Sequence, residues 1–134
     1  MVAPTYGLLD TSVLIAAESG RPLNRQLLPE KAAISVITAA ELEAGLLVAP
    51  STADRARRLA TIKSIIDIES LPVDAAVASS WAQLRVRLSE AGKRMDANDL
   101  WIAATAVAND LPLITQDADY EILAQLKELS VILV

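Results

Sequence analysis

The chain has 134 residues and a net charge of −5, and this length fits a single domain over residues 1–134 that needs no disulfides or structural metal. Hydrophobic residues make up 53% of the sequence and aromatic residues only 3%, so the core must consist mainly of aliphatic side chains. The sequence contains no cysteine and no histidine, which excludes thiol chemistry and Ser-His-Asp or Cys-His catalysis. Carboxylates, Lys, Tyr and a metal-activated water remain as catalytic groups.

The first third of the chain alternates between strand-like and helical patterns. Tyr6–Leu9 is a short apolar run that ends at a polar turn, which is typical of a buried strand. Residues 12–18 are expected to form a helix that ends near Gly20, and residues 21–30 another short helix. The β-branched residues of segment 32–37 predict the second strand.

The middle of the chain is expected to contain two helices, a strand and a long helix, at residues 38–48, 51–68, 70–73 and 74–91. Thr38 and Glu41 have the spacing of a capping box at the start of the first helix. Asp74 is positioned to cap the long helix, and Gly92 follows its end.

The last third is expected to contain an alanine-rich helix, a strand, a short helix and a final strand, at residues 98–107, 111–115, 119–126 and 131–134. Asn98 or Asp99 begins the alanine-rich helix. Because strands and helices alternate along the whole chain, we predict an α/β fold in which helices cover both faces of a mostly parallel sheet.

Four acidic residues stand near the predicted strand ends. Asp10 ends the first strand, Glu41 lies just past the second, and Asp117 follows the strand at 111–115. Asp99 begins the helix that leads into that strand. Ligands of such sheets collect beyond the carboxyl ends of the strands, so we expect at least three of these acids to lie on one rim.

Each of the four acids also has a purely structural explanation. Asp10 and Asp99 can cap the helices that follow them, and Glu41 can be the acid of the capping box. Asp117 can form an Asx turn. Convergence favours a functional role, since two carboxylates about 5 Å apart repel by about 3 kcal/mol at an effective dielectric constant near 20. A cluster of this kind would be protonated or would bind a cation.

The absence of histidine and cysteine leaves only oxygen ligands, which select Mg²⁺ or Mn²⁺ over zinc. Such a rim is typical of phosphoryl-transfer sites, where the metal neutralises a phosphate and activates water. Thr11, Ser12 and Thr115 flank the acids and are expected to hold them in position. Asp96 and Asp119 are further acids near the rim, ranked lower because a solvated turn explains each of them.

Four segments of the sequence carry the pattern of a known nuclease family, namely residues 9–12 with the apolar run after them, 35–42, 98–104 and 113–120. In order and spacing they resemble the PIN domain, the nuclease domain of VapC-type toxins from bacterial toxin–antitoxin pairs. The resemblance covers residues 7–133. It implies an α/β/α sandwich with a roughly five-stranded, mostly parallel sheet.

The resemblance also implies a Mg²⁺- or Mn²⁺-dependent endoribonuclease that cuts single-stranded regions of RNA with a metal-activated water. The family's acidic positions are matched by Asp10, Glu41, Asp99 and Asp117. All but Glu41 are expected to hold the metal, and Glu41 to ligate it or to orient the water. The implied partners are a VapB-type antitoxin that blocks the acidic site and a second copy of the chain, in a homodimer or, with antitoxin, in a heterotetramer or larger assembly.

Positive charge is concentrated in the middle of the chain. Residues 1–54 contain 3 basic and 6 acidic side chains, residues 55–94 contain 8 and 4, and residues 95–134 contain 1 and 7. The candidates for RNA phosphate contacts are Arg55, Arg58, Arg87, Lys93 and Arg94. Solvated helix faces are the alternative explanation of the same charges.

Two other functions remain open from the sequence. A PIN-like nuclease of RNA processing, or one that cuts DNA, would have no antitoxin, and a PIN-fold binding module would have lost catalysis. The complete set of four acids favours an active enzyme. Tyr120 and Trp101 depart mildly from the family pattern, which usually has Phe and an aliphatic residue there.

The N-terminal segment MVAPTYG does not resemble a signal peptide, and no run reaches the roughly 18 apolar residues of a membrane span, so we expect a cytoplasmic protein.

Overall fold

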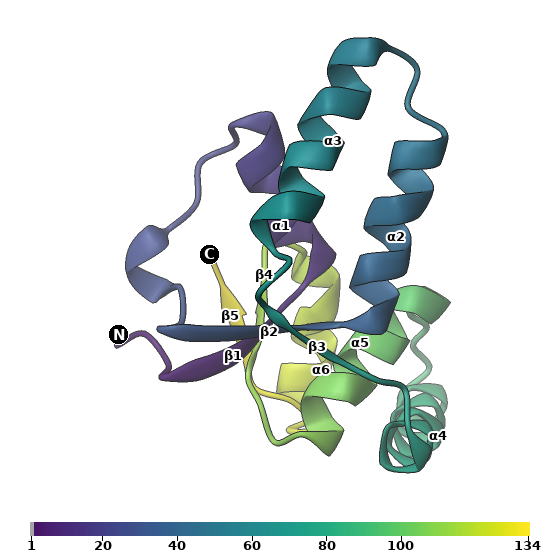
Figure 1. Ribbon diagram of the computed structural model, residues 1–134. Helices are drawn as coiled ribbons and strands as arrows, with labels where there is room; N and C mark the ends of the chain where they lie inside the picture. Colours follow the sequence, from purple (N-terminus) through teal and green to yellow (C-terminus); the bar gives the residue numbers. More distant parts are fainter. Residues whose placement is uncertain (1) are drawn as a thin grey trace.

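Five parallel strands form the centre of the molecule in the computed structural model, which describes residues 2–134 (Figure 1). They are β1 (Tyr6–Leu9), β2 (Lys31–Ser35), β3 (Glu69–Leu71), β4 (Leu113–Thr115) and β5 (Val131–Leu133). Their order in the sheet is β3-β2-β1-β4-β5, and every neighbouring pair is parallel. The predicted α/β fold with a parallel sheet is confirmed.

Helices cover both faces of this sheet. They are α1 (Thr11–Ser19), α2 (Val36–Leu47), α3 (Thr52–Ser64), α4 (Ala75–Glu90), α5 (Ala97–Ala108) and α6 (Glu121–Gln125), with short 3₁₀ turns η1 (Arg25–Leu27) and η2 (Ala118–Tyr120). Leu8 and Leu113 pack against α4, α5 and α6, whereas their neighbours Leu9 and Ile114 pack on the opposite face with α1, α2 and α3. Because successive strand residues point to opposite faces, these short apolar strands build two cores and an α/β/α sandwich. Figure 1 shows α2 and α3 side by side, and α4 beside α5.

Strand β2 ends earlier than predicted, and its helix begins at once. Ser35 caps α2, since its hydroxyl accepts a hydrogen bond from the backbone N–H of Ile37 at 3.0 Å. Val36 and Ile37 are therefore helical despite their β-branched side chains. The predicted capping box is wrong, because Thr38 lies buried inside α2 and is not its cap. Glu41 is consequently left with no capping role.

The predicted helix at residues 21–30 is also wrong. Only Arg25–Leu27 is helical there, as a single 3₁₀ turn. Pro22 and Pro29 remove backbone donors near both ends of the segment, which opposes a continuous α-helix. The other predicted elements are present with ends moved by a few residues, and the predicted helix at 119–126 divides into η2 and α6. Within residues 2–134, no helix has both the length and the apolar character needed to cross a membrane.

Candidate metal and active site

Asp10 links β1 to α1 and is buried, with 3% of its surface exposed. Its Oδ2 accepts hydrogen bonds from the backbone N–H of Ser12 at 3.3 Å and from the hydroxyl of Thr115 at 2.9 Å. Its Oδ1 accepts a hydrogen bond from the hydroxyl of Tyr120 at 3.0 Å. Both carboxylate oxygens are therefore held by donors, and Asp10 serves as the cap of α1 while its carboxylate stays fixed at the rim of the sheet.

Hydroxyl groups connect Asp10 to the loop after β4. The Ser12 and Thr115 hydroxyl oxygens lie 3.1 Å apart, and the Ser12 oxygen also accepts a hydrogen bond from the backbone N–H of Gln116 at 3.0 Å. The backbone N–H of Asp117 donates to the Thr115 hydroxyl at 2.9 Å. The Asp117 carboxylate in turn accepts a hydrogen bond from the backbone N–H of Asp119 at 2.8 Å. This is the Asx-type contact that the sequence offered as its structural explanation. These contacts bring Asp117 to the same rim as Asp10.

Asp99 lies in the first turn of α5 but does not cap it. The N-cap is Asp96, whose Oδ2 accepts hydrogen bonds from the backbone N–H groups of Asn98 and Asp99 at 3.1 and 3.3 Å. The predicted cap at Asn98 or Asp99 is therefore wrong by two or three positions. Because Asp96 satisfies the helix terminus, the Asp99 carboxylate is left for a different role.

The environment of Asp99 opposes its negative charge. Burial, followed by the negative charge of Asp10, raises the pKa of Asp99 from its ordinary value of 3.8 to about 6. The charges of Asp96 and Asp117 contribute to this rise in pKa, and hydrogen bonding from Tyr120 partly offsets it. Asp10, Asp99 and Asp117 are thus close enough to interact electrostatically, as the sequence predicted for acids on one rim.

Glu41 is linked to the rim by a hydrogen bond from Thr11. The hydroxyl of Thr11 donates a hydrogen bond to Glu41 Oε1 at 2.8 Å and lies 2.9 Å from the hydroxyl of Thr38. Thr11 directly follows Asp10 in the sequence, so the residue that contacts Glu41 is next to the buried carboxylate. The contact links Glu41 to the residue that follows Asp10.

The donor chemistry of this rim fits a hard divalent cation. The acids supply only oxygen ligands, and their mutual repulsion, seen in the raised pKa of Asp99, is the imbalance that a cation relieves. Across residues 2–134, however, no three acidic side chains are already arranged to hold a metal ion. The site is therefore a set of coupled carboxylates and not a preformed cage.

The sequence matches the family model of the PIN domain over residues 7–126. The chain belongs to the PIN domain family. Ribonuclease VapC5 from Mycobacterium tuberculosis (strain ATCC 25618 / H37Rv) is 54% identical to it over 117 residues, which are 87% of each protein. Ribonuclease VapC4 from the same strain is 42% identical over 113 residues, which are 84% of this chain and 87% of that protein. The crystal structure of VapBC-5, a member of the VapBC family of toxin–antitoxin systems from M. tuberculosis, superimposes with a TM-score of 0.90 and 47% identity, over 98% of this chain and 100% of that chain.

Tyr120 is the residue of this PIN domain that sequence reasoning missed. Its side chain is fully buried, and its hydroxyl donates to Asp10. The sequence marked it only as a departure from the usual Phe. A buried tyrosine hydroxyl needs a hydrogen-bond partner, so a Tyr at a position where Phe suffices was the available signal for a polar contact.

The basic residues predicted to bind RNA divide into two groups. Arg58 pairs with Glu18 at 2.8 Å, and both side chains are mostly buried, at 16% and 14% exposure. Arg87 pairs with Glu128 at 3.2 Å. These two arginines therefore have structural partners, which account for them without RNA. No ion pair is found, within residues 2–134, for the other three candidates Arg55, Lys93 and Arg94.

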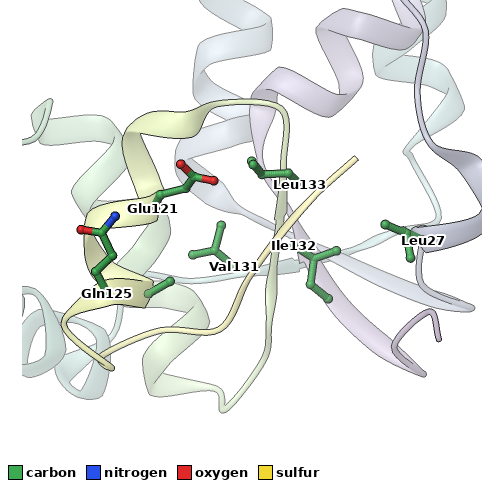
Figure 2. A pocket seen from close by; sticks show the side chains of 7 residues that line it. Leu27, Glu121, Gln125, Val131, Ile132 and Leu133 are labelled. Carbon is green, nitrogen blue, oxygen red and sulfur yellow. The ribbon is translucent and has the colours of Figure 1, made fainter. Parts of the chain in front are cut away.

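A separate hollow lies beside the edge strand β5 of the PIN domain. Figure 2 shows it between Glu121 and Gln125 of α6 on one side and Leu27 of η1 on the other, with Val131–Leu133 crossing it. Its volume is about 410 Å³. None of the four predicted acids lines it, so it is distinct from the acidic rim.

Proposed function

We propose that this PIN domain protein is a VapC-type toxin, an endoribonuclease that hydrolyses phosphodiester bonds in single-stranded regions of RNA. The observation that carries the proposal is the burial of Asp99 beside the negative charges of Asp10, Asp96 and Asp117, which together raise the pKa of Asp99 to about 6. Strongly perturbed carboxylates at the carboxyl edge of a parallel sheet are typical of active sites. The ribonuclease names of VapC5 and VapC4, which match most of the chain, support the same activity.

The proposed cofactor is Mg²⁺ or Mn²⁺, held by Asp10, Asp99 and Asp117. Carboxylate oxygens without histidine or cysteine are the ligands that these two ions prefer. When bound, the ion supplies neutralisation of the phosphate charge and makes water more acidic.

The other residues of the rim have positioning roles in this proposal. Thr115 and Tyr120 orient the Asp10 carboxylate through their hydroxyls, and Ser12 holds Thr115 in place. Thr11 orients Glu41, whose free oxygen is then available to align the attacking water or to accept its proton. The attack forms a bond from the water oxygen to phosphorus and breaks the bond to the leaving ribose oxygen, with no covalent enzyme intermediate.

The proposal includes a partner and a place of action. We expect a VapB-type antitoxin to block the acidic site, a homodimer of the toxin, and a heterotetramer or larger complex of the two chains in the cytoplasm. The similarity to VapBC-5, a toxin–antitoxin structure, supports this expectation. Titration of the purified antitoxin into a cleavage reaction tests it, because inhibition at a fixed toxin-to-antitoxin ratio is expected.

The activity is tested with purified protein, a labelled single-stranded RNA and a DNA of the same sequence, in Mg²⁺ or Mn²⁺ and then with EDTA. We expect the RNA alone to be cut, the chelator to stop cutting, and Asp10→Ala to abolish it. Asp67→Asn, an exposed acid between α3 and β3, is the matched control and should cut normally. Cutting that survives EDTA or Asp10→Ala would contradict the proposal, as would an intact RNA under both metals.

A further inference from the structure

A cationic hollow lies at the C-terminal end of α4 and in the loop that leads to α5. Its volume is about 690 Å³, and the basic residues that line it are Arg85, Lys93 and Arg94. The buried side chains of Leu88 and Leu100 also line it. No acidic residue does, and in the described part of the chain none of the three basic side chains forms an ion pair. The hollow is therefore a concave surface with three solvent-exposed positive charges.

The hollow adjoins the acidic rim through the first turn of α5. Met95 and Leu100 line the hollow, and Asp96 and Asp99 stand between them in the sequence. Asp99 and Leu100 are consecutive residues, whose Cα atoms are about 3.8 Å apart. The hollow and the acidic rim therefore meet at the first turn of α5.

An aromatic pair stands beside this hollow. Trp81 of α4 stacks on Trp101 of α5, with ring centroids 4.9 Å apart and an interplanar angle of 18°. The guanidinium of Arg85 lies 5.7 Å from the centroid of Trp81, within the range of a cation–π contact. These are the two tryptophans of the sequence, so the fluorescence of the protein comes mainly from a pair that adjoins Arg85 of the hollow.

Charge identifies the class of molecule that this surface suits. The protein carries a net charge of −5, and its proposed active site is acidic, so a polyanionic substrate needs a local cluster of cations to bind near that site. Lys and Arg side chains supply the affinity of proteins for nucleic acid backbones. Of the candidates named from the sequence, Arg58 and Arg87 are paired with carboxylates, whereas Lys93 and Arg94 of the hollow are not.

We propose that Arg85, Lys93 and Arg94 bind the phosphate backbone of the RNA strand next to the bond that is cut. The inference rests on the proposed function, since it names where the substrate of that site is held. Arg85 lines the hollow, and its guanidinium lies within cation–π distance of Trp81.

The test is a titration of the full chain with a single-stranded RNA in EDTA. Binding is measured by tryptophan fluorescence and by the fluorescence anisotropy of labelled RNA. A triple variant Arg85→Gln, Lys93→Gln and Arg94→Gln removes the proposed contacts. Each lost contact lowers the salt slope by about 0.7, which corresponds to about fivefold in affinity at 0.1 M salt. The triple variant should therefore bind about 100-fold more weakly, with a salt slope reduced by about 2.

Two further variants separate a local contact from total charge and from folding. The control variant Arg25→Gln, Lys63→Gln and Lys127→Gln removes the same number of exposed charges elsewhere and should lose less than about threefold in affinity. The variant Lys93→Arg and Arg94→Lys keeps the charges and should bind within about twofold of the wild type. Thermal melts of all three confirm that each variant is folded.

The outcomes distinguish this inference from the proposed function. A wild type that cuts RNA in Mn²⁺ while the Gln variant of the hollow binds RNA equally well overturns the inference and leaves the nuclease in place. A control variant that loses as much affinity as the Gln variant of the hollow also overturns it, because total charge then accounts for the effect. A wild type that neither binds nor cuts RNA contradicts both.

Discussion

Replacement of Asp99 by asparagine is expected to stabilise the metal-free protein at neutral pH. Burial and the charge of Asp10 raise the pKa of Asp99 to about 6 from an ordinary value of 3.8, so the folded state opposes ionisation of this carboxyl. Asparagine has nearly the same shape and no charge. The substitution therefore removes an unfavourable interaction that the folded protein retains at pH 7.

The size of the effect follows from the pKa shift and its sign from proton linkage. A shift of about two pKa units corresponds to about 3 kcal/mol, and solvent screening of this partly exposed side chain reduces that to about 1–2 kcal/mol. Because the folded state binds the proton more tightly, the contribution of Asp99 to stability is fully present below pH 3.8 and is lost as the pH rises to about 6. The Asp99→Asn variant has no such loss, because its amide does not titrate in this range.

The assay is urea denaturation of both proteins in EDTA, from pH 4 to pH 7.5. The Asp99→Asn variant should exceed the wild type in free energy of unfolding by about 1–2 kcal/mol at pH 7, with a difference near zero at pH 4. Asp67→Asn makes the same change of charge at an exposed position and should change stability by less than about 0.5 kcal/mol throughout. A destabilised Asp99→Asn variant at pH 7, or a difference that does not vary with pH, would refute the electrostatic reasoning.

Three further substitutions test the contacts that build the fold and the rim. Tyr120→Phe should lower the free energy of unfolding by about 1–3 kcal/mol in urea, because a buried carboxylate loses a donor, and an unchanged midpoint would argue against that contact. In Gly45→Ala the new Cβ would collide with Nη1 of Arg58 and displace its hydrogen bond to the Leu42 carbonyl, so a loss of about 1 kcal/mol is expected in the same assay; a normal melting curve would show that the arginine rearranges without cost. Thr11→Val should lower kcat for RNA cleavage about tenfold with unchanged Mn²⁺ affinity, since it frees Glu41, and an equal kcat would remove the positioning role.

The order of the elements and the position of the rim were predictable because they depend on local signals. Short apolar runs mark the strands, and Asp10 and Asp74 cap helices as their positions predict. Once the strands are parallel, acids that follow them must share an edge. The presence of Asp10 and Asp117 on one rim therefore follows from the sequence alone, and the coupling with Asp99 agrees with it.

The remaining features depend on contacts between distant parts of the chain. Ser35 and Thr38 are both suitable caps for α2, and the choice falls on Ser35 because Thr38 is buried against Thr11 of another helix. The partner of Arg58 is Glu18, forty positions earlier, and no periodicity in the sequence identifies it. The hydroxyl of Tyr120 likewise meets a carboxylate from the opposite end of the chain.

The most direct test of the central claim is a Mn²⁺ titration of the metal-free protein at pH 7, with the free ion measured by electron paramagnetic resonance. If Asp10, Asp99 and Asp117 hold a divalent cation, the wild type binds Mn²⁺ saturably, and Asp99→Asn weakens that binding by at least about tenfold even though it stabilises the fold. Asp67→Asn should bind as the wild type does. Equal affinities of the wild type and Asp99→Asn, or no saturable binding by the wild type, would contradict the assignment of these acids as a metal site.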